Sequence, residues 1–280
     1  APRLYFGVNA GAMDSMVNHY TAAKRLRSDD AYTPEGKAGQ RPDYAVTVYT
    51  KILKEIYPDI PVVIGGIEAS LRRVTHYDYW QDTLKPSILV ESGADWLCYG
   101  MGERTMIEFT RAIEAGRNIA DIRKIPQLGF YMDGKCKVKD AVILNSYDRC
   151  RKDKIAFAEN FHVIETYANM LEPPVLVEPV GKGYVQINPT WPPATQEEMD
   201  SFWDLPYTKL PHPRYKGKHI PAFEMIKFSI NTHRGCFGGC NFCTIAAHQG
   251  KFIQSRSEES ILKEIEALGK LPGFAGTISD

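Results

Sequence analysis

Three of the six cysteines lie within one run of eight residues, and their spacing restricts the fold more than any other feature. Cys236, Cys240 and Cys243 are separated by three residues and then by two, and two glycines lie in the first gap. Glycines allow the backbone to turn tightly and to approach a bulky inorganic ligand. Three thiolates on such a loop can bind three irons of a 4Fe–4S cluster and leave the fourth iron open for chemistry. Residues 234–243, called the cysteine loop below, therefore predict a cluster site.

Other roles for these thiols stay open on spacing alone. A structural zinc site usually takes four protein ligands, often as two C-x2-C pairs, and only the pair Cys240 and Cys243 occurs here. His233 and His248 flank the loop and could supply a fourth ligand, although neither has zinc-finger spacing. A disulfide framework is less expected, because the other three cysteines are isolated and the chain is long enough to form a core. Three unrelated core thiols are the simplest alternative.

The composition indicates an ordinary globular protein. Lys and Arg number 34, as do Asp and Glu, so no basic surplus indicates a nucleic-acid partner. No apolar run approaches the ~20 residues of a membrane span, and no signal peptide is recognisable. We therefore predict a cytoplasmic protein without a membrane partner, a location that suits an oxygen-sensitive cluster. A length of 280 residues predicts about two domains.

Strand and helix signals alternate along the first part of the chain. Alternation of this kind is typical of a doubly wound parallel sheet, so we predict an α/β domain over residues 1–172. Residues 128–132 and 141–144 are predicted as edge strands. Further strands are predicted at 4–8, 61–64 and 95–99, and helices at 44–57, 103–115 and 154–171. Helix 44–57 has one face with Val48, Ile52 and Ile56, and helix 154–171 is predicted to turn Phe157, Phe161, Ile164 and Leu171 inward.

Ligands of such sheets bind beyond the carboxyl ends of the strands, so candidate substrate residues are sought there. The segments expected to meet there are the long polar stretch 11–43, the Gly65-Gly66 turn and the glycines at 100 and 102. Glycines at these places are also common in simple tight turns. No G-x-G-x-x-G occurs, so a dinucleotide site is not supported. The candidates for contacting substrate are Glu68, Tyr77, Asp78, Trp80 and Glu103.

The last third of the chain divides into a connector and the start of a second domain. Residues 173–221 hold ten of the eighteen prolines, which disfavour long helices and strands, so we predict an ordered strap over 173–224. A flexible linker is the alternative. From 225 to 280 we predict a strand at 225–230, a helix at 257–268 capped by Ser257, and a second strand at 276–279.

The cysteine loop, entered through Arg-Gly and written C-x3-C-x-aromatic-C, resembles the signature loop of radical S-adenosylmethionine (SAM) enzymes. Four further segments resemble the YgiQ family of these proteins, namely 65–73, 76–80, 100–104 and 253–261. The resemblance implies that residues 225–280 form the first strands and helix of a partial (βα) barrel. Because two strands cannot close a barrel, we expect the chain to be a fragment of a longer protein, inactive by itself.

The family resemblance also implies a cofactor and a reaction. Cys236, Cys240 and Cys243 would bind a 4Fe–4S cluster whose open iron holds SAM. An electron from the cluster would cleave SAM to a 5′-deoxyadenosyl radical that removes hydrogen from an unknown substrate. Phe242 matches the position near the adenine, and Arg256 and Ser257 could meet the methionyl or ribose end. An electron donor such as flavodoxin or ferredoxin is implied. The alternatives are an iron–sulfur module for electron transfer or redox sensing and a zinc-stabilised binding module.

The first domain resembles the cobalamin-binding domain that precedes many radical SAM barrels. In those domains a D-x-H-x-x-G motif supplies the histidine that ligates cobalt. None of the seven histidines here has Asp two positions before it. Cobalamin held through that histidine is therefore not expected, although the fold could be retained with another ligand in the pocket.

Overall fold

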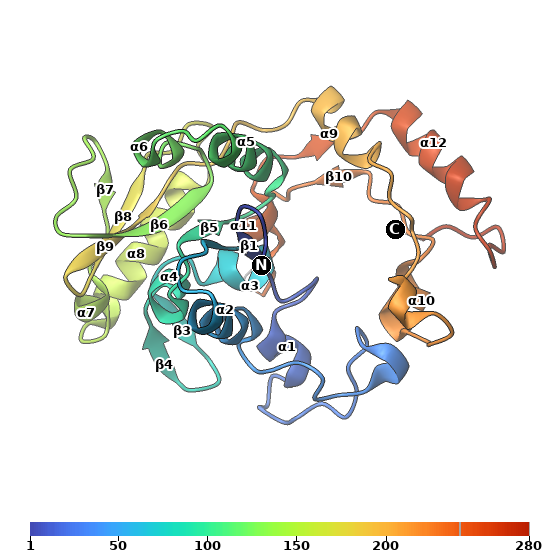
Figure 1. Cartoon of the computed structure of the whole chain (residues 1–280), viewed down its shortest axis with the longest axis horizontal. Coiled ribbons are helices and arrows are strands. Elements are labelled where there is room, and N and C mark those ends of the chain that lie inside the picture. Colours follow the sequence, from blue (N-terminus) through green and yellow to red (C-terminus); the bar gives the residue numbers. More distant parts are fainter. Residues whose placement is uncertain (241, 280) are drawn as a thin grey trace.

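A mixed sheet forms the framework of the first part of the protein. The computed structural model describes residues 1–240 and 242–279, and within them seven strands pair in the order β1-β2-β5-β6-β9-β8-β7 (Figure 1). The first three strands are parallel, β5, β6, β9 and β8 pair antiparallel, and β7 is parallel to β8. Their bounds are Phe6–Val8 (β1), Val62–Ile64 (β2), Trp96–Cys98 (β5), Leu128–Asp133 (β6), Val142–Ile143 (β7), Leu176–Val180 (β8) and Gly183–Ile187 (β9). The predicted α/β class with a parallel sheet is confirmed, and its continuation is antiparallel.

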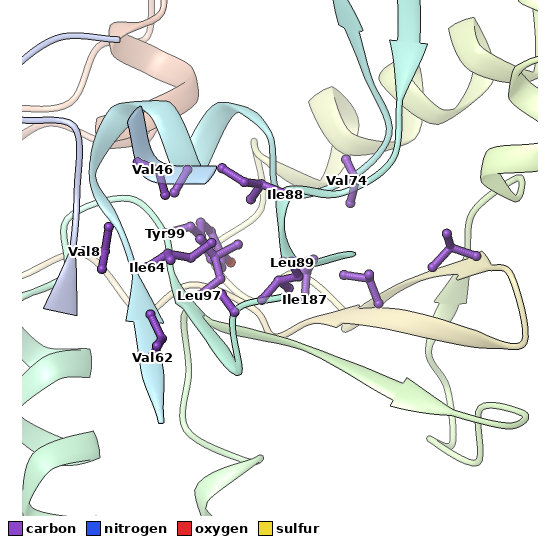
Figure 2. Packing of buried hydrophobic residues seen from close by; sticks show 14 of the residues in the cluster. Val8, Val46, Val62, Ile64, Val74, Ile88, Leu89, Leu97, Tyr99 and Ile187 are labelled. Atoms are coloured by element: carbon purple, nitrogen blue, oxygen red, sulfur yellow. The ribbon is translucent and has the colours of Figure 1, made fainter. Parts of the chain in front are cut away.

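Helices cover both faces of the sheet, as the doubly wound prediction requires. Val62 and Ile64 face α2 (Ala45–Ile56) and α4 (Ile88–Ser92), whereas Val63 between them faces α5 (Glu103–Glu114) and α6 (Ile119–Ile122). This alternation follows from the two-residue period of a strand. Figure 2 shows the first of these cores, where the strand residues meet side chains of the covering helices. Each fully buried aliphatic side chain contributes about 1.5–3 kcal/mol.

The sheet extends into the segment that we predicted as a connector. That prediction is wrong for residues 176–187, which form the β8–β9 hairpin inside the sheet, with every residue of β9 buried. Pro179 does not interrupt the ladder. The backbone N–H and C=O groups of odd-numbered residues here point toward β7, as the hydrogen bond from the Val142 N–H to the Val175 oxygen shows. The pairing with β7 extends only as far as Val177. The missing N–H of Pro179 therefore costs no hydrogen bond.

The prediction of an edge strand at 128–132 is wrong, and the predicted inward face of helix 154–171 holds for Ile164 but not for Phe161 or Leu171. Strand β6 lies in the interior of the sheet rather than at an edge. Helix α2 buries Val46, while Ile52 and Ile56 are 46% and 59% exposed. Helix α8 (Lys154–Tyr167) exposes Phe161, and it is anchored instead by buried Asn160, whose amide exchanges hydrogen bonds with the Asn145 backbone. Both helices still pack apolar side chains against the core, among them Leu53 of α2 and Ile164 of α8.

The second part of the chain begins with a helix where a strand was predicted. Residues 225 and 226 end α10 (Pro221–Ile226), because a proline at its first position favours helix. Extended backbone begins afterwards, where the Ile230 N–H donates to the Ser279 oxygen at 3.0 Å in a parallel bridge. The predicted helix is confirmed as α12 (Glu258–Leu268). Strands β10 (His233–Arg234) and β11 (Gln254–Ser255) flank the cysteine loop and α11 (Ile245–Gln249).

The two parts of the chain also meet through the long polar stretch 11–43. The Ala222 N–H of α10 donates to the Ala31 oxygen at 2.8 Å, and Figure 1 shows α10 beside this stretch. No helix among residues 1–240 and 242–279 is long and apolar enough to cross a membrane. The remaining elements are α1 (Ser15–His19), η1 (Pro34–Gly36), α3 (Gly66–Leu71), β3 (His76–Asp78), β4 (Thr83–Lys85), α7 (Tyr147–Cys150), α9 (Gln196–Trp203) and η2 (Pro213–Tyr215).

Candidate functional site

The root of the cysteine loop is held by backbone contacts. Strands β10 and β11 pair antiparallel, and the Cys236 N–H donates to the Gly250 oxygen at 3.0 Å. Gly235 has φ +87°, and a Cβ there would lie 2.1 Å from the Phe252 oxygen. Only glycine satisfies both the left-handed backbone and this close approach. The loop therefore leaves β10 in one defined direction.

Two of the three loop thiols lie beside Gly238. A Cβ added at Gly238 would lie 3.3 Å from the Cys236 sulfur and 3.8 Å from the Cys240 sulfur. The Cys243 N–H donates to the Cys240 oxygen at 3.2 Å, which keeps the third cysteine one turn away. Across the described part of the chain, no three His, Cys, Asp or Glu side chains are grouped closely enough to hold a metal ion. The loop thus gathers two sulfurs, and the third is not grouped with them.

The residues of the loop fit an iron–sulfur cluster by their chemistry. All three cysteines are free, and Cys240 is exposed. The absent side chain of Gly238 leaves room beside two sulfurs, and a Cβ there would be in tight contact with the Cys236 sulfur. Phe237 and Phe242 are 84% and 89% exposed, so the loop carries apolar surface next to the thiols. An apolar shell of this kind controls solvent access to a metal site.

Arg256 and Ser257, which were candidates for meeting SAM, are engaged in the local fold. Arg256 is 4% exposed and donates to the Asn231 oxygen at 2.9 Å and to Glu264 at 2.5 Å. The Ser257 hydroxyl accepts the Ser260 N–H at 3.1 Å, so its predicted role as the cap of α12 is confirmed. Their contacts fix the segment that leaves the cysteine loop.

Glu68 lies in the core rather than in a crevice. It is 1% exposed and accepts hydrogen bonds from the Ser15 N–H at 2.8 Å and the Val46 N–H at 2.9 Å. Both donors belong to first turns of helices, where backbone N–H groups lack partners within the helix. The carboxylate of Glu68 thus joins α1 and α2 to α3.

Tyr77, Asp78 and Trp80 belong to the β3–β4 hairpin and its turn. Trp80 stacks on Tyr20 with 3.8 Å between ring centroids. Asp78 is buried, 3.4 Å from the Lys85 ammonium, and the Tyr77 hydroxyl donates to Asp82 at 2.5 Å. None of these three side chains lines the cavity described next. Their contact with substrate stays a prediction.

A cavity of about 160 Å³ lies between the carboxyl end of β5 and α11. Gly100 permits this approach, since it has φ +69° and its Cβ would lie 3.1 Å from the His248 oxygen. Glu103 lines the cavity and pairs with Arg234 of β10 at 2.7 Å. Of the five candidates for the substrate crevice, Glu103 is the one that lines this space.

Arg73 and Lys251 also line the cavity, and sequence reasoning did not single them out. Arg73 ends a segment that carried the family resemblance, which was the available signal. That signal could not distinguish a side chain turned into a cavity from one turned to solvent. His248 was considered only as a zinc ligand.

A family model described as Radical SAM N-terminal matches residues 1–229. The chain is 54% identical over 282 residues to a UPF0313 protein of Porphyromonas gingivalis, covering all of this chain and 44% of that protein. It is 50% identical to a UPF0313 protein of Methanocella arvoryzae over 279 residues, covering all of this chain and 46% of the relative. UPF0313 protein YgiQ of Escherichia coli K12 is 42% identical over 335 residues, covering 100% of this chain and 45% of the relative. The chain spans about half the length of the curated relatives it matches.

Among solved structures, the chain is similar to the radical SAM methyltransferase TsrM from Kitasatospora setae. The match to TsrM with cobalamin and a 4Fe–4S cluster bound has 19% identity and a TM-score of 0.40, and covers 79% of this chain and 31% of TsrM. A second TsrM structure matches with 20% identity and a TM-score of 0.41, covering 87% and 33%. The bound groups are properties of TsrM, and the expectation about cobalamin in this chain stays untested.

Proposed function

Because this chain belongs to the radical SAM N-terminal family and is related along its whole length to the YgiQ proteins, we propose that the whole protein is a radical SAM enzyme. The family match ends just before the cysteine loop. The observation that carries the proposal is the C-x3-C-x2-C loop, in which the Cys236 and Cys240 sulfurs both lie beside Gly238. A 4Fe–4S cluster there would supply the electron that splits SAM, giving a 5′-deoxyadenosyl radical able to take hydrogen from substrate.

Residues of the cysteine loop would either bind the cluster directly or hold the loop in place. Cys236, Cys240 and Cys243 would be the three ligands of the cluster. Gly235 fixes where the loop begins, and the Cys236 N–H contact to Gly250 keeps the first thiol in place. Thiol ligands must lose their protons to bind metal.

Residues around the loop would position it and exclude water. The Glu103–Arg234 ion pair joins the beginning of α5 to β10, and the Arg234 guanidinium lies 4.4 Å from the Trp203 ring centroid. This pair fixes the loop relative to the sheet. Phe242 presents an exposed ring beside the cysteines and is proposed to adjoin the adenine of SAM. We propose that Arg256 and Ser257 support the cysteine loop indirectly, through their contacts within and beside α12.

The test is formation of 5′-deoxyadenosine by the full-length protein after anaerobic reconstitution with iron and sulfide. With SAM and dithionite, or with reduced flavodoxin as the proposed electron donor, we expect the product by mass spectrometry. Cys236→Ala should abolish it. The control Cys136→Ser, outside the loop, should retain it. A full-length protein with an intact cluster and bound SAM but no product would instead be an iron–sulfur module for electron transfer or redox sensing.

A further inference from the structure

The cavity between β5 and α11 contains an arginine without an acidic partner. The Arg73 Nη1 donates to the Ser70 oxygen at 2.8 Å, and the guanidinium lies 5.3 Å from the Tyr99 ring centroid. No ion pair among the residues that the structure describes includes Arg73. Burial lowers the pKa of Arg73, yet an arginine stays charged at any working pH. Arg73 is half-buried and lacks an ion pair among the described residues, so an anion in the cavity would stabilise it.

The acids that line the same cavity form their ion pairs with other cations, and Glu165 stabilises the charge of Arg73 only without direct contact. Glu103 pairs with Arg234 at 2.7 Å, and Glu165 pairs with Lys251 at 2.6 Å. Each carboxylate therefore has its own cation. The cavity keeps a positive charge at Arg73.

His248 adds a second polar group to the cavity. Its Nδ1 atom has almost no accessible surface and no hydrogen-bond partner in the described residues. Imidazole nitrogens can donate a proton to an oxyanion when they carry it. A buried polar atom without a partner is unfavourable, and a turn of the ring toward the cavity would let a ligand oxygen satisfy it.

Much of the remaining lining is apolar, although polar side chains such as Gln127, Asn188 and Gln254 also reach the cavity. The apolar residues include Ile164, Leu176, Ile187, Trp191 and Phe252. The Trp191 Nε1 donates to the Thr105 hydroxyl at 3.0 Å, which holds the indole ring in place. The volume of about 160 Å³ is far above the ~15 Å³ that one water requires. A polar end and an apolar body in one small space match an amphipathic small molecule.

We propose that this cavity binds an organic oxyanion, a carboxylate or a phosphate ester with an apolar body, through the Arg73 guanidinium and His248. Arginine presents a planar fork that matches the geometry of both groups. The site lies beyond the carboxyl end of β5, where open α/β sheets bind ligands. It is lined by α8, α11, residues 187–194 and the Glu103–Arg234 pair as well as by the sheet, and the binding of an anion there does not require a cluster on the cysteine loop.

The test measures binding of benzoate and of phenyl phosphate to the metal-free 280-residue chain by isothermal titration calorimetry. Neutral benzamide is the matched ligand. We expect saturable binding of at least one anion and none of benzamide at the same concentrations. Preference between the two anions distinguishes a carboxylate ligand from a phosphate ester. Arg73→Met should weaken anion binding roughly tenfold or more. Arg111→Met, which removes an exposed arginine of α5, should leave it unchanged.

If Arg73→Met fails to fold, two further variants test whether the cavity binds anions as proposed. Arg73→Lys keeps the charge but loses the fork, and His248→Phe keeps the ring shape but loses the donor. Both should weaken binding severalfold. The proposal is overturned if wild-type protein binds neither anion at millimolar concentration, if benzamide binds as well as benzoate, or if the Arg73 and His248 variants bind like wild type.

Discussion

Glu178 of β8 is a buried acid whose protonation is coupled to folding. It is 1% exposed and accepts the Thr75 N–H at 2.8 Å and 3.1 Å through its two oxygens. Burial raises the pKa of Glu178 from its usual 4.5 to about 7, although the Thr75 hydrogen bonds oppose this. The folded state therefore binds the proton more tightly than the unfolded state. The stability contributed by this group is present below pH 4.5 and is lost as the pH rises through about 7.

Glu178→Gln should remove this pH dependence. Between pH 4.5 and pH 8, the free energy of unfolding of wild type relative to the variant should fall by about 3 kcal/mol. Urea denaturation of both proteins at several pH values measures the difference, in which the titrations of other groups cancel. Parallel curves for the two proteins would contradict the account. Glu159→Gln, which changes a solvent-facing glutamate of α8, serves as the control.

Single-residue roles could be predicted where they depend on neighbours in the chain. Ser257 was predicted to cap α12 because the hydroxyl and the N–H that it accepts lie within one turn. Glu68 could not be assigned, since its two donors are 53 and 22 residues away. The same holds for Arg73, whose cavity is formed by segments far apart in the sequence. The grouping of the three loop cysteines was visible from their spacing, and their role as cluster ligands stays a prediction.

At the scale of elements, Gly235 decides whether β10 can lead into the cysteine loop. Gly235→Ala forces a side chain into left-handed backbone and against the Phe252 oxygen. The strain alone should cost about 1–3 kcal/mol locally. The Cys236 N–H, which bonds the Gly250 oxygen, should then exchange with solvent tens of times faster or more. Hydrogen exchange followed by mass spectrometry of this segment measures the effect.

Gly239 provides a matched control in the same loop. A Cβ at Gly239 would meet nothing within 4 Å, and its backbone is not left-handed. Gly239→Ala should therefore leave the exchange of the Cys236 N–H unchanged. Equal exchange in the two variants would show that the close approach at Gly235 does not hold the loop.

Elements with strong local patterns were predictable, and those set by tertiary contacts were not. β2 and β5 are short apolar runs between turns, and α5 has a clear helical period. The β8–β9 hairpin was missed because proline is normally excluded from ladders, and only the end of β7 makes Pro179 acceptable. The prediction of a strand at 225–230 is wrong at its start, because Pro221 begins a helix, α10, that extends to Ile226.

At the scale of the whole molecule, the family resemblance predicted from motifs is confirmed by the family match and the YgiQ relatives. The structure adds how the cysteine loop is joined to the sheet. The Glu103–Arg234 ion pair and the close approach of α11 to Gly100 connect the loop region to the sheet. A separate hydrogen bond, from the Ala222 N–H to the Ala31 oxygen, joins α10 to the stretch 11–43. The junction was not predictable, because it requires the relative placement of segments that share no local pattern.

The central claim is that three thiolates of one loop hold a 4Fe–4S cluster, and metal analysis tests it most directly. After anaerobic reconstitution and desalting, iron, zinc and acid-labile sulfide are measured per chain. The account predicts about four irons and four sulfides in wild type and in Cys136→Ser, with large losses of both in Cys236→Ala, Cys240→Ala and Cys243→Ala. One zinc per chain without sulfide, or iron and sulfide that persist in all three alanine variants, would contradict it.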